Sequence, residues 1–381
     1  MHPQERTEDL TIAAATFVAV GPTAEIALPS IGVVTSTPMT EAAAVPVDLS
    51  PWFTGDDAAK DAVAAEVDRA CSTTGFLALT GHGVSTDLMQ QVLDVSQAFF
   101  DLPVDQKMAY FLDDAAANRG YAPFESEALS YSLGVESEPD LFEAFNVGRE
   151  VVPPGTSAEA AKTYFSPNVW PVEPAEMRQT YLAYWDACEE LGHTLCSVFA
   201  RALGLEADFF ESYLDRAPSV MRANHYRRRD GHVPSASQLR MGAHSDYGSL
   251  TILLADQVPG LQILDADTTF RDVTPPENGF LVNLGDLLAE WTNDRWRSTV
   301  HRVVPPGPEA ASGGRRRSVA WFQQPNHDAT IRVLDVCCDE DNPPRYPETT
   351  AGEHLMAKLM GPRTGDAVDV DRAFITELGH D

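Results

Sequence analysis

A succession of short β-rich segments in the second half of the chain constrains the fold most strongly. Turn signals such as Asp230-Gly231, Pro275-Pro276 and Gly313-Gly314 separate these segments. Gly and Pro interrupt regular structure, and many short strands divided in this way predict a sandwich, a barrel or a jelly roll. The expected strands cover residues 220–227, 248–254, 260–264, 279–284, 297–304, 315–323 and 329–334.

The first half of the chain has a different pattern. Residues 57–71, 87–100 and 175–203 repeat apolar side chains at intervals of three and four, which is typical of amphipathic helices. Short strands are expected at residues 45–49 and 75–79, whereas residues 114–154 are irregular and resemble a lid or a pocket wall. The predicted fold class is therefore α+β, with N-terminal helices flanking a β core.

Composition limits the partners of the chain. Its 381 residues can bury a substantial core. The 27 Lys and Arg against 57 Asp and Glu give a net charge of −30, which argues against nucleic acids and anionic membranes. The chain has no apolar run of about 18 residues, the minimum for a membrane-spanning helix. Five cysteines without a C-x-x-C spacing predict a reduced, cytoplasmic protein, which we expect to be a monomer.

Four regions are expected along the chain. Residues 1–44 lack sustained periodicity and carry acidic residues where a signal peptide would be basic, so they are expected to form a poorly ordered extension. Residues 45–218 should form a helix and strand region that packs on the core. Residues 219–335 should form the β core itself, and residues 336–381 a C-terminal segment.

His244 and Asp246 stand two residues apart in a segment rich in β-formers. Residues i and i+2 of a strand point to the same face, so both side chains should project together from one strand. They would supply two ligands of a 2-His-1-carboxylate site, which suits non-haem Fe(II) because it leaves one face of the metal open. A His-x-Asp pair is common by chance, so the prediction depends on a third ligand.

His301 is the best candidate for this third ligand. It lies on a later expected strand, and a jelly roll brings such non-adjacent strands together. His225, His232 and His327 compete for the role, and His225 has an almost equal strand context. We therefore expect a metal site formed by His244, Asp246 and His301.

A second constellation lies on the expected strand 315–323. Alternation places Arg316, Ser318, Ala320 and Phe322 inward, and Arg315, Arg317 and Val319 outward. An inward guanidinium beside a hydroxyl is suited to binding a carboxylate through charge-assisted hydrogen bonds. The alternative is a solvated basic edge strand, which suits Arg315 and Arg317.

Together these motifs resemble the iron- and 2-oxoglutarate-dependent dioxygenases, and most closely the isopenicillin N synthase-like branch. The resemblance covers roughly residues 45–363, and its motifs occur in the order of that family. They include Gly81-His-Gly83, Arg119-Gly-Tyr121, Asn224-His-Tyr226, His244-Ser-Asp246, Asn283-Leu-Gly-Asp286, Ser298-Thr-Val-His301 and Arg316-Arg-Ser318.

The resemblance implies a distorted jelly roll, the cupin-like double-stranded β-helix. It implies that His244, Asp246 and His301 bind Fe(II), and that Arg316 and Ser318 bind the distal carboxylate of 2-oxoglutarate. It also places Asn224 and Tyr226 beside this co-substrate, although Arg227 follows where relatives usually have Pro. The implied reaction consumes O2, releases succinate and CO2, and oxidises a C–H bond of a small or medium metabolite by hydroxylation, desaturation or cyclisation.

Three other functions compete with this interpretation. An oxidase of the isopenicillin N synthase type uses iron and O2 without 2-oxoglutarate, and it retains an Arg-x-Ser pair, so Arg316 and Ser318 do not discriminate. A zinc hydrolase could use the same ligands, but the chain has no H-E-x-x-H motif. A catalytically silent binding module is disfavoured because the set of three ligands is complete.

Overall fold

The computed structural model describes residues 43–114, 117–134, 137–227, 238–305 and 315–364. Residues 1–42 of the predicted extension, together with Arg228, Arg229 and His232, lie outside the described residues. The boundaries predicted at residues 45, 219 and 336 remain predictions.

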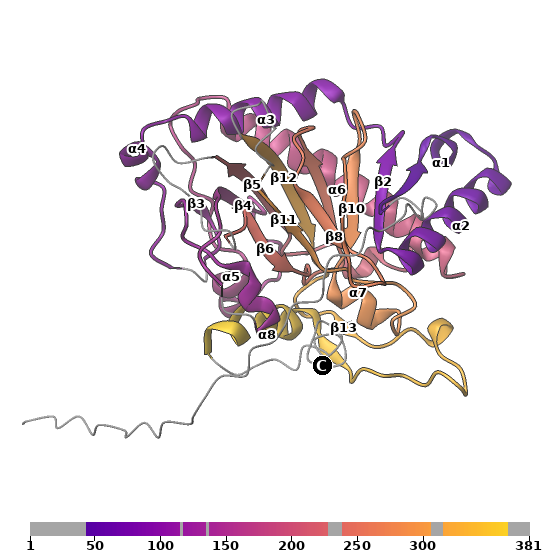
Figure 1. Cartoon of the computed structure of the whole chain (residues 1–381). Coiled ribbons are helices and arrows are strands. Elements are labelled where there is room, and N and C mark those ends of the chain that lie inside the picture. The colour runs from indigo at the N-terminus through magenta and orange to yellow at the C-terminus, as the bar shows by residue number, and fades with distance from the viewer. Residues whose placement is uncertain (1–42, 115–116, 135–136, 228–237, 306–314, 365–381) are drawn as a thin grey trace, which may run out of the picture. The chain divides into compact units, whose positions relative to one another are not determined.

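Within the described residues the strands form an eight-stranded, a four-stranded and a two-stranded sheet (Figure 1). The strand order of the large sheet is β1 (Val45–Asp48), β2 (Phe76–Thr80), β10 (Phe280–Leu284), β7 (Leu250–Ala255), β12 (Arg316–Gln323), β5 (Val220–Tyr226), β4 (Glu143–Gly148) and β3 (Gly120–Ala122). The small sheet contains β6 (Met241–His244), β11 (His301–Val303), β8 (Leu261–Leu264) and β9 (Phe270–Asp272), and β13 (Thr330–Ile331) pairs with β14 (Thr349–Thr350).

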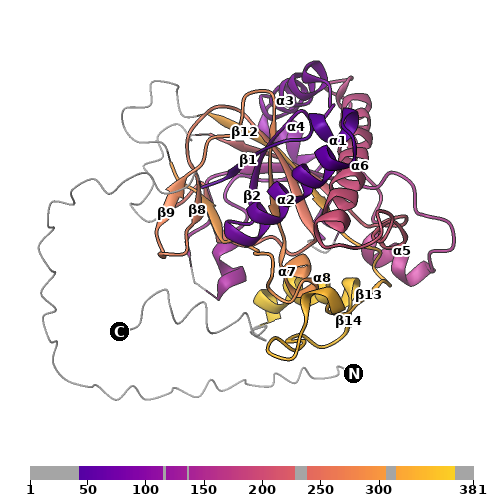
Figure 2. The same ribbon diagram turned by 90° about the vertical axis from the view of Figure 1, so that its right-hand side faces the viewer.

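Helices from the first half of the chain cover one face of the large sheet. The longest are α2 (Asp57–Thr73), α3 (Thr86–Phe100) and α6 (Met177–Ala202), and α2 and α3 both pack against α6 (Figure 2). The shorter helices are α1 (Ser50–Thr54), α4 (Val104–Met108), α5 (Ala158–Tyr164) and α7 (Asp286–Trp291), and α8 (Ala351–Thr364) follows the last strand. Three 3₁₀ turns are described, at η1 (Leu129–Leu133), η2 (Glu211–Tyr213) and η3 (Asp335–Cys337).

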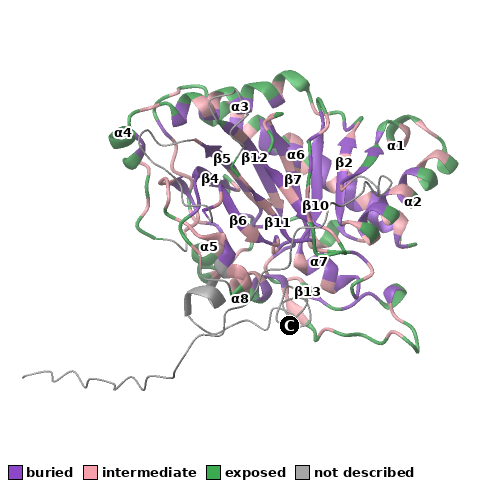
Figure 3. Cartoon of the chain, viewed as in Figure 1, coloured by how far each residue is buried: buried purple, intermediate pink, exposed green. Residues whose placement is uncertain are grey.

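The apolar side chains form two cores, one on each face of the large sheet. The larger core joins the helices to the sheet and includes Val67, Phe99, Tyr184 and Trp321. The smaller core lies between the large and small sheets, where Phe76, Tyr226, Leu281, Ile263 and Val303 meet. The strands of the large sheet are therefore mostly buried, while the helices expose their outer faces (Figure 3).

Local sequence signals explain the ends of the helices. Ser85 begins α3 as its N-cap, because its hydroxyl accepts a hydrogen bond from the Leu88 amide. Gly204 follows α6 with a left-handed φ of +72°, a conformation that glycine adopts without steric cost. These two features confirm the predicted limits of both helices to within one or two residues.

The sequence pattern was misleading in several places. The irregular region 114–154 contains β3 and β4, and every residue of β4 is buried, so the strand shows no polar alternation. Val319, predicted to face outward, is fully buried because α3 and α6 cover that face of β12. The strands expected at residues 297–304 and 329–334 are shorter in the structure, where only β11 and β13 form regular strands within these ranges.

Candidate metal centre

His244 and His301 reach the centre from paired strands. β6 ends at His244, β11 begins at His301, and these two residues lie opposite each other in the antiparallel ladder. Asp246 lies beyond β6, where the chain crosses from the small sheet to β7 of the large sheet. The prediction that His244 and Asp246 share one strand is therefore wrong. The Asp246 carbonyl instead accepts a hydrogen bond from the Asp286 amide at 2.8 Å, which fixes the crossing.

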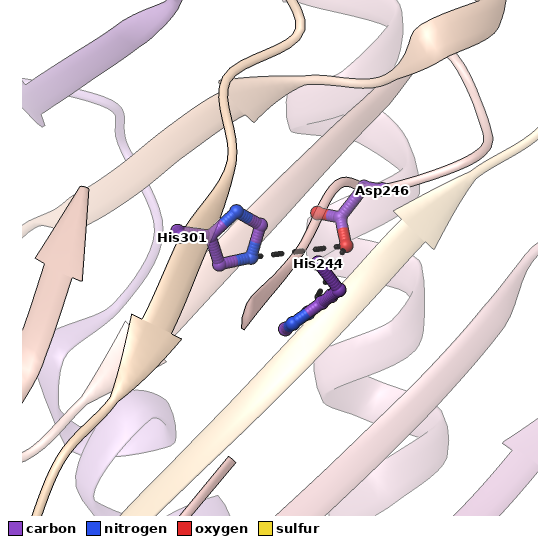
Figure 4. Close-up of side chains that lie close together, drawn as sticks. All are labelled: His244, Asp246 and His301. Carbon is purple, nitrogen blue, oxygen red and sulfur yellow. Dashed lines mark ion pairs between the residues drawn. The ribbon is translucent and has the colours of Figure 1, made fainter. Parts of the chain in front are cut away.

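The three side chains converge despite this difference (Figure 4). Their metal-binding atoms all lie within 4.8 Å of one another. Asp246 Oδ1 is 3.9 Å from Nε2 of His244 and 3.9 Å from Nε2 of His301. All three residues are buried. Two imidazole nitrogens and one carboxylate oxygen therefore face the same point.

Backbone carbonyls orient both imidazole rings. Nδ1 of His244 lies 2.8 Å from the Gly242 oxygen, and Nδ1 of His301 lies 3.1 Å from the Thr299 oxygen. A carbonyl only accepts, so each Nδ1 carries the proton and donates it, which leaves a lone pair on Nε2. Burial, together with the nearby His301, lowers the pKa of His244, which keeps its ring neutral and available as a ligand.

The second carboxylate oxygen of Asp246 is held by hydrogen bonds. Thr251 Oγ1 donates to Oδ2 at 2.5 Å, and Asn283 Nδ2 donates to it at 2.6 Å. Burial alone would raise the pKa of Asp246, but the pKa is lowered, and the hydrogen bonds from Thr251 and Asn283 contribute to this lowering. An ionised carboxylate with one oxygen fixed and one directed at two neutral imidazoles fits Fe(II).

Asp286 connects the loop that carries Asp246 to two other segments. It accepts hydrogen bonds from Ser245 Oγ at 3.1 Å and Ser298 Oγ at 2.6 Å. Lys358 of α8 lies 2.8 Å from its Oδ2. His354, also on α8, contacts the Tyr247 carbonyl at 3.2 Å. The C-terminal helix therefore braces the same loop from outside.

The four residues predicted near the co-substrate lie together on β5 and β12. In the antiparallel register Arg316 pairs with Tyr226, and Ser318 pairs with Asn224. The Arg316 guanidinium carbon is 5.0 Å from the centre of the Tyr226 ring, and that ring belongs to the core between the two sheets. Arg316 and Ser318 therefore face the interior between the sheets, as alternation predicts.

Arg316 and Ser318 carry unused hydrogen-bonding atoms. Within the described part of the chain, the buried Arg316 Nε and Ser318 Oγ have no hydrogen-bond partner. Leaving a buried donor unpaired costs about 1–3 kcal/mol, so such atoms call for an acceptor. A carboxylate satisfies a guanidinium and a hydroxyl together, and the pair therefore fits the distal end of 2-oxoglutarate.

Comparisons with known proteins agree with this geometry. Residues 217–325 match the 2OG-Fe(II) oxygenase superfamily, and residues 45–173 match the family described as non-haem dioxygenase in morphine synthesis N-terminal. The 2-oxoglutarate-Fe(II) type oxidoreductase hxnY of Emericella nidulans is 33% identical over 308 residues, covering 80% of this chain and 86% of that protein. The chain belongs to the Fe(II)- and 2-oxoglutarate-dependent oxygenase superfamily.

Two solved structures extend the match from this oxygenase's sequence to its fold. Neurospora crassa T7H in complex with alpha-KG and thymine has a TM-score of 0.74 and 30% identity, covering 85% of this chain and 98% of T7H. A putative 2OG-Fe(II) oxygenase from Caulobacter crescentus has a TM-score of 0.72 and 32% identity, over 84% and 98%. The predicted double-stranded β-helix is confirmed, and the reaction depends on Fe(II) and 2-oxoglutarate. The comparisons do not support the oxidase alternative.

Two of the histidines that compete with His301 in this oxygenase, His225 and His327, have structural contacts. His225 lies 3.0 Å from Glu143 and stacks on Phe100, and His327 stacks on Tyr164. The described residues contain one group able to hold a metal, His244, Asp246 and His301. They contain no helix that is both long and apolar enough to cross a membrane.

Proposed function

We propose that His244, Asp246 and His301 are the ligands through which this oxygenase holds Fe(II). One observation carries the assignment: the two Nε2 atoms and Asp246 Oδ1 converge on one point. The remaining polar atoms of these side chains, the two Nδ1 atoms and Asp246 Oδ2, form hydrogen bonds with other residues. Three protein ligands leave the remaining positions of an octahedral ion open. A 2-oxo acid and O2 require such open positions.

We further propose that Arg316 and Ser318 bind the distal carboxylate of 2-oxoglutarate, with Tyr226 and Asn224 beside it. Their support is the pair of buried donors without partners, Arg316 Nε and Ser318 Oγ. Asn224 is itself held in place, because its Oδ1 accepts a hydrogen bond from Arg222 Nε at 3.0 Å. Arg222 is fixed in turn by Glu127 at 2.8 Å.

When bound, Fe(II), 2-oxoglutarate and O2 supply the oxidising power, and a C–H bond of a small or medium metabolite is oxidised while succinate and CO2 are released. The chain contributes position and environment. The two imidazoles and Asp246 orient the metal, Arg316 and Ser318 set the depth of the co-substrate, and the buried walls exclude water. A relative named validamycin A dioxygenase, from Streptomyces hygroscopicus subsp. limoneus, is 34% identical over 320 residues, covering 82% of this chain and 84% of that enzyme.

An anaerobic titration of the Fe(II) protein with 2-oxoglutarate tests both assignments. We expect a weak visible charge-transfer band that saturates with added 2-oxoglutarate, because a 2-oxo acid chelates the metal through its carboxylate and keto oxygens. A protein that binds iron stoichiometrically and gives no band would contradict the proposed function.

Arg316→Lys should weaken 2-oxoglutarate binding by about 10- to 100-fold, because an ammonium group cannot form the paired hydrogen bonds of a guanidinium. The dissociation constant is read from the same band. The Fe(II) affinity of this variant, measured without 2-oxoglutarate, should stay within about twofold of wild type, since Arg316 contacts no metal ligand. An unchanged dissociation constant for 2-oxoglutarate would remove Arg316 from this role.

We also propose that the protein acts as a monomer in the cytoplasm, with neither nucleic acid nor a membrane as partner. Two observations support this proposal: all five cysteines are free, and the net charge is −30. Sedimentation equilibrium should therefore give the mass of one chain, 41.5 kDa. A concentration-independent mass twice as large would contradict the monomer.

A further inference from the structure

Another buried arginine, Arg240, lies near the pocket that contains Arg316 and Ser318. It directly precedes β6, and its backbone amide donates a hydrogen bond to the Val303 oxygen at 2.9 Å, which continues the pairing of β6 with β11. The next residue, Met241, accepts a hydrogen bond from the Tyr226 hydroxyl through Sδ at 3.7 Å, and the Tyr226 ring lies 5.0 Å from the Arg316 guanidinium carbon. Only 4% of Arg240 is exposed.

The Arg240 guanidinium has an unused donor in the same pocket. Its Nη1 is buried and has no hydrogen-bond partner within the described residues, like Arg316 Nε and Ser318 Oγ. Burial and the charge of Arg316 together lower the pKa of Arg240 to about 10, although Tyr226 and Asp256 act in the opposite direction. Arg240 and Arg316 are therefore close enough to repel each other in a poorly solvated space.

The charges in this space do not balance without a ligand. Arg240 and Arg316 contribute two positive charges, and Asp256 contributes one negative charge near Arg240. Asp256 is already engaged, since its Oδ2 accepts a hydrogen bond from the Arg317 amide at 2.8 Å. Two buried like charges are costly unless an anion pairs with them. Asp256 also lies 3.6 Å from Arg317 Nε, so within the described residues neither Arg240 nor Arg316 has a carboxylate of its own, and a bound carboxylate would supply one.

We propose that Arg240 is a second guanidinium that binds the distal carboxylate of 2-oxoglutarate, from the side opposite Arg316 and Ser318. This inference rests on the proposed function of that pocket. Arg316 belongs to the large sheet, and Arg240 directly precedes β6 of the small sheet, so the carboxylate would bridge the two sheets. Two guanidinium groups also make the site more selective for a dicarboxylic 2-oxo acid than Arg316 alone would.

The decisive comparison uses two 2-oxo acids of equal chain length. Wild type and Arg240→Met are titrated anaerobically, as Fe(II) proteins, with 2-oxoglutarate and with 2-oxopentanoate, which lacks the distal carboxylate. We expect Arg240→Met to raise the dissociation constant of 2-oxoglutarate by about 10- to 100-fold, the value of a charge-assisted hydrogen bond. The dissociation constant of 2-oxopentanoate should stay within about twofold.

Two further variants and a second readout complete the test. Arg271→Met removes a guanidinium from β9 at the outer edge of the same sheet and should leave both constants unchanged. Arg240→Lys keeps the charge and should give an intermediate loss. Without metal and 2-oxoglutarate, Arg240→Met should melt no lower than wild type, because it replaces an unpaired buried charge with an apolar side chain.

The possible failures are distinguishable. No band with wild-type protein would overturn the proposed function and this inference with it. A normal wild-type titration with an unchanged constant in Arg240→Met would overturn the inference alone. Equal weakening of both acids, or a melting temperature well below that of wild type, would assign Arg240 a structural role and also overturn it.

Discussion

Asp246→Ala is expected to abolish Fe(II) binding and turnover while the protein stays folded. The substitution removes the one negative charge among the three proposed ligands, and two neutral imidazoles alone hold divalent iron weakly. It also leaves the side chains of Thr251 and Asn283 without their acceptor, at a cost of about 1–3 kcal/mol. That cost is smaller than the total stability of a typical domain, about 5–15 kcal/mol.

Three measurements on one preparation check this expectation. Iron is quantified after anaerobic loading and desalting, succinate release is followed over time, and circular dichroism reports the fold. Asp267→Ala is a matched control, because Asp267 is an exposed carboxylate paired with Arg271 in the turn between β8 and β9. His244→Ala should behave like Asp246→Ala. Full activity in either ligand variant would disprove the metal assignment.

The metal centre shows what local sequence spacing can predict. His244 and Asp246 were singled out because alternate strand residues share a face, yet Asp246 lies outside any strand. The two side chains still converge, because the chain turns toward the large sheet and the Asp286 amide holds the Asp246 carbonyl. The spacing therefore predicts a pair that does converge in the structure, but for a geometric reason that is only half right. Thr251 and Asn283 could not be assigned to Asp246 without the fold.

The pocket around Arg316 illustrates a second limit. Alternation along one strand was enough to place Arg316 and Ser318 inward, and the register with β5 then brings Tyr226 and Asn224 opposite them. Spacing does not reveal Arg240 in the same way, because a register shift in the pairing of β6 with β11 separates it from His244. The proposed role of Arg240 depends on its proximity to Arg316 across the two sheets. No pattern within a single sequence segment indicates which residues of two different sheets lie close together.

The sequence pattern also fails to predict β4, again because the deciding contacts lie outside the segment itself. Strand prediction relies on alternation between buried and exposed residues, and all six residues of β4 are buried. Its first residue, Glu143, is a charged side chain inside the protein, which a sequence pattern assigns to a loop. Only the partners of Glu143 explain its position. Lys107 lies 2.6 Å and Tyr121 lies 2.5 Å from Oε2, and Oε1 is 3.0 Å from both His225 and Arg227.

Glu143→Gln is expected to destabilise the protein by about 3–5 kcal/mol at pH 7, the usual cost of removing one partner from a buried ion pair. Lys107 is 1% exposed and Glu143 is fully buried, so solvent cannot replace the lost carboxylate. Denaturant unfolding of both proteins measures the difference. Lys107→Met combined with Glu143→Gln should recover much of the loss, because the fully buried ammonium group is then removed and only the partly exposed Arg227 lacks the carboxylate. A loss below about 1 kcal/mol in Glu143→Gln would contradict the interpretation.

The pH dependence of this loss identifies its cause. Burial alone would raise the pKa of Glu143, but hydrogen bonds from His225, Lys107 and Tyr121 outweigh burial and lower the pKa from 4.5 to about 2. A depressed carboxyl pKa stabilises the folded state above the unfolded value, and this stabilisation is lost as the pH falls toward the folded value. The difference between wild type and Glu143→Gln should therefore be constant above pH 4.5 and shrink between pH 4.5 and 2. A difference that persists unchanged at pH 2 would mean that packing, and not the carboxylate charge, stabilises this end of β4 and β5.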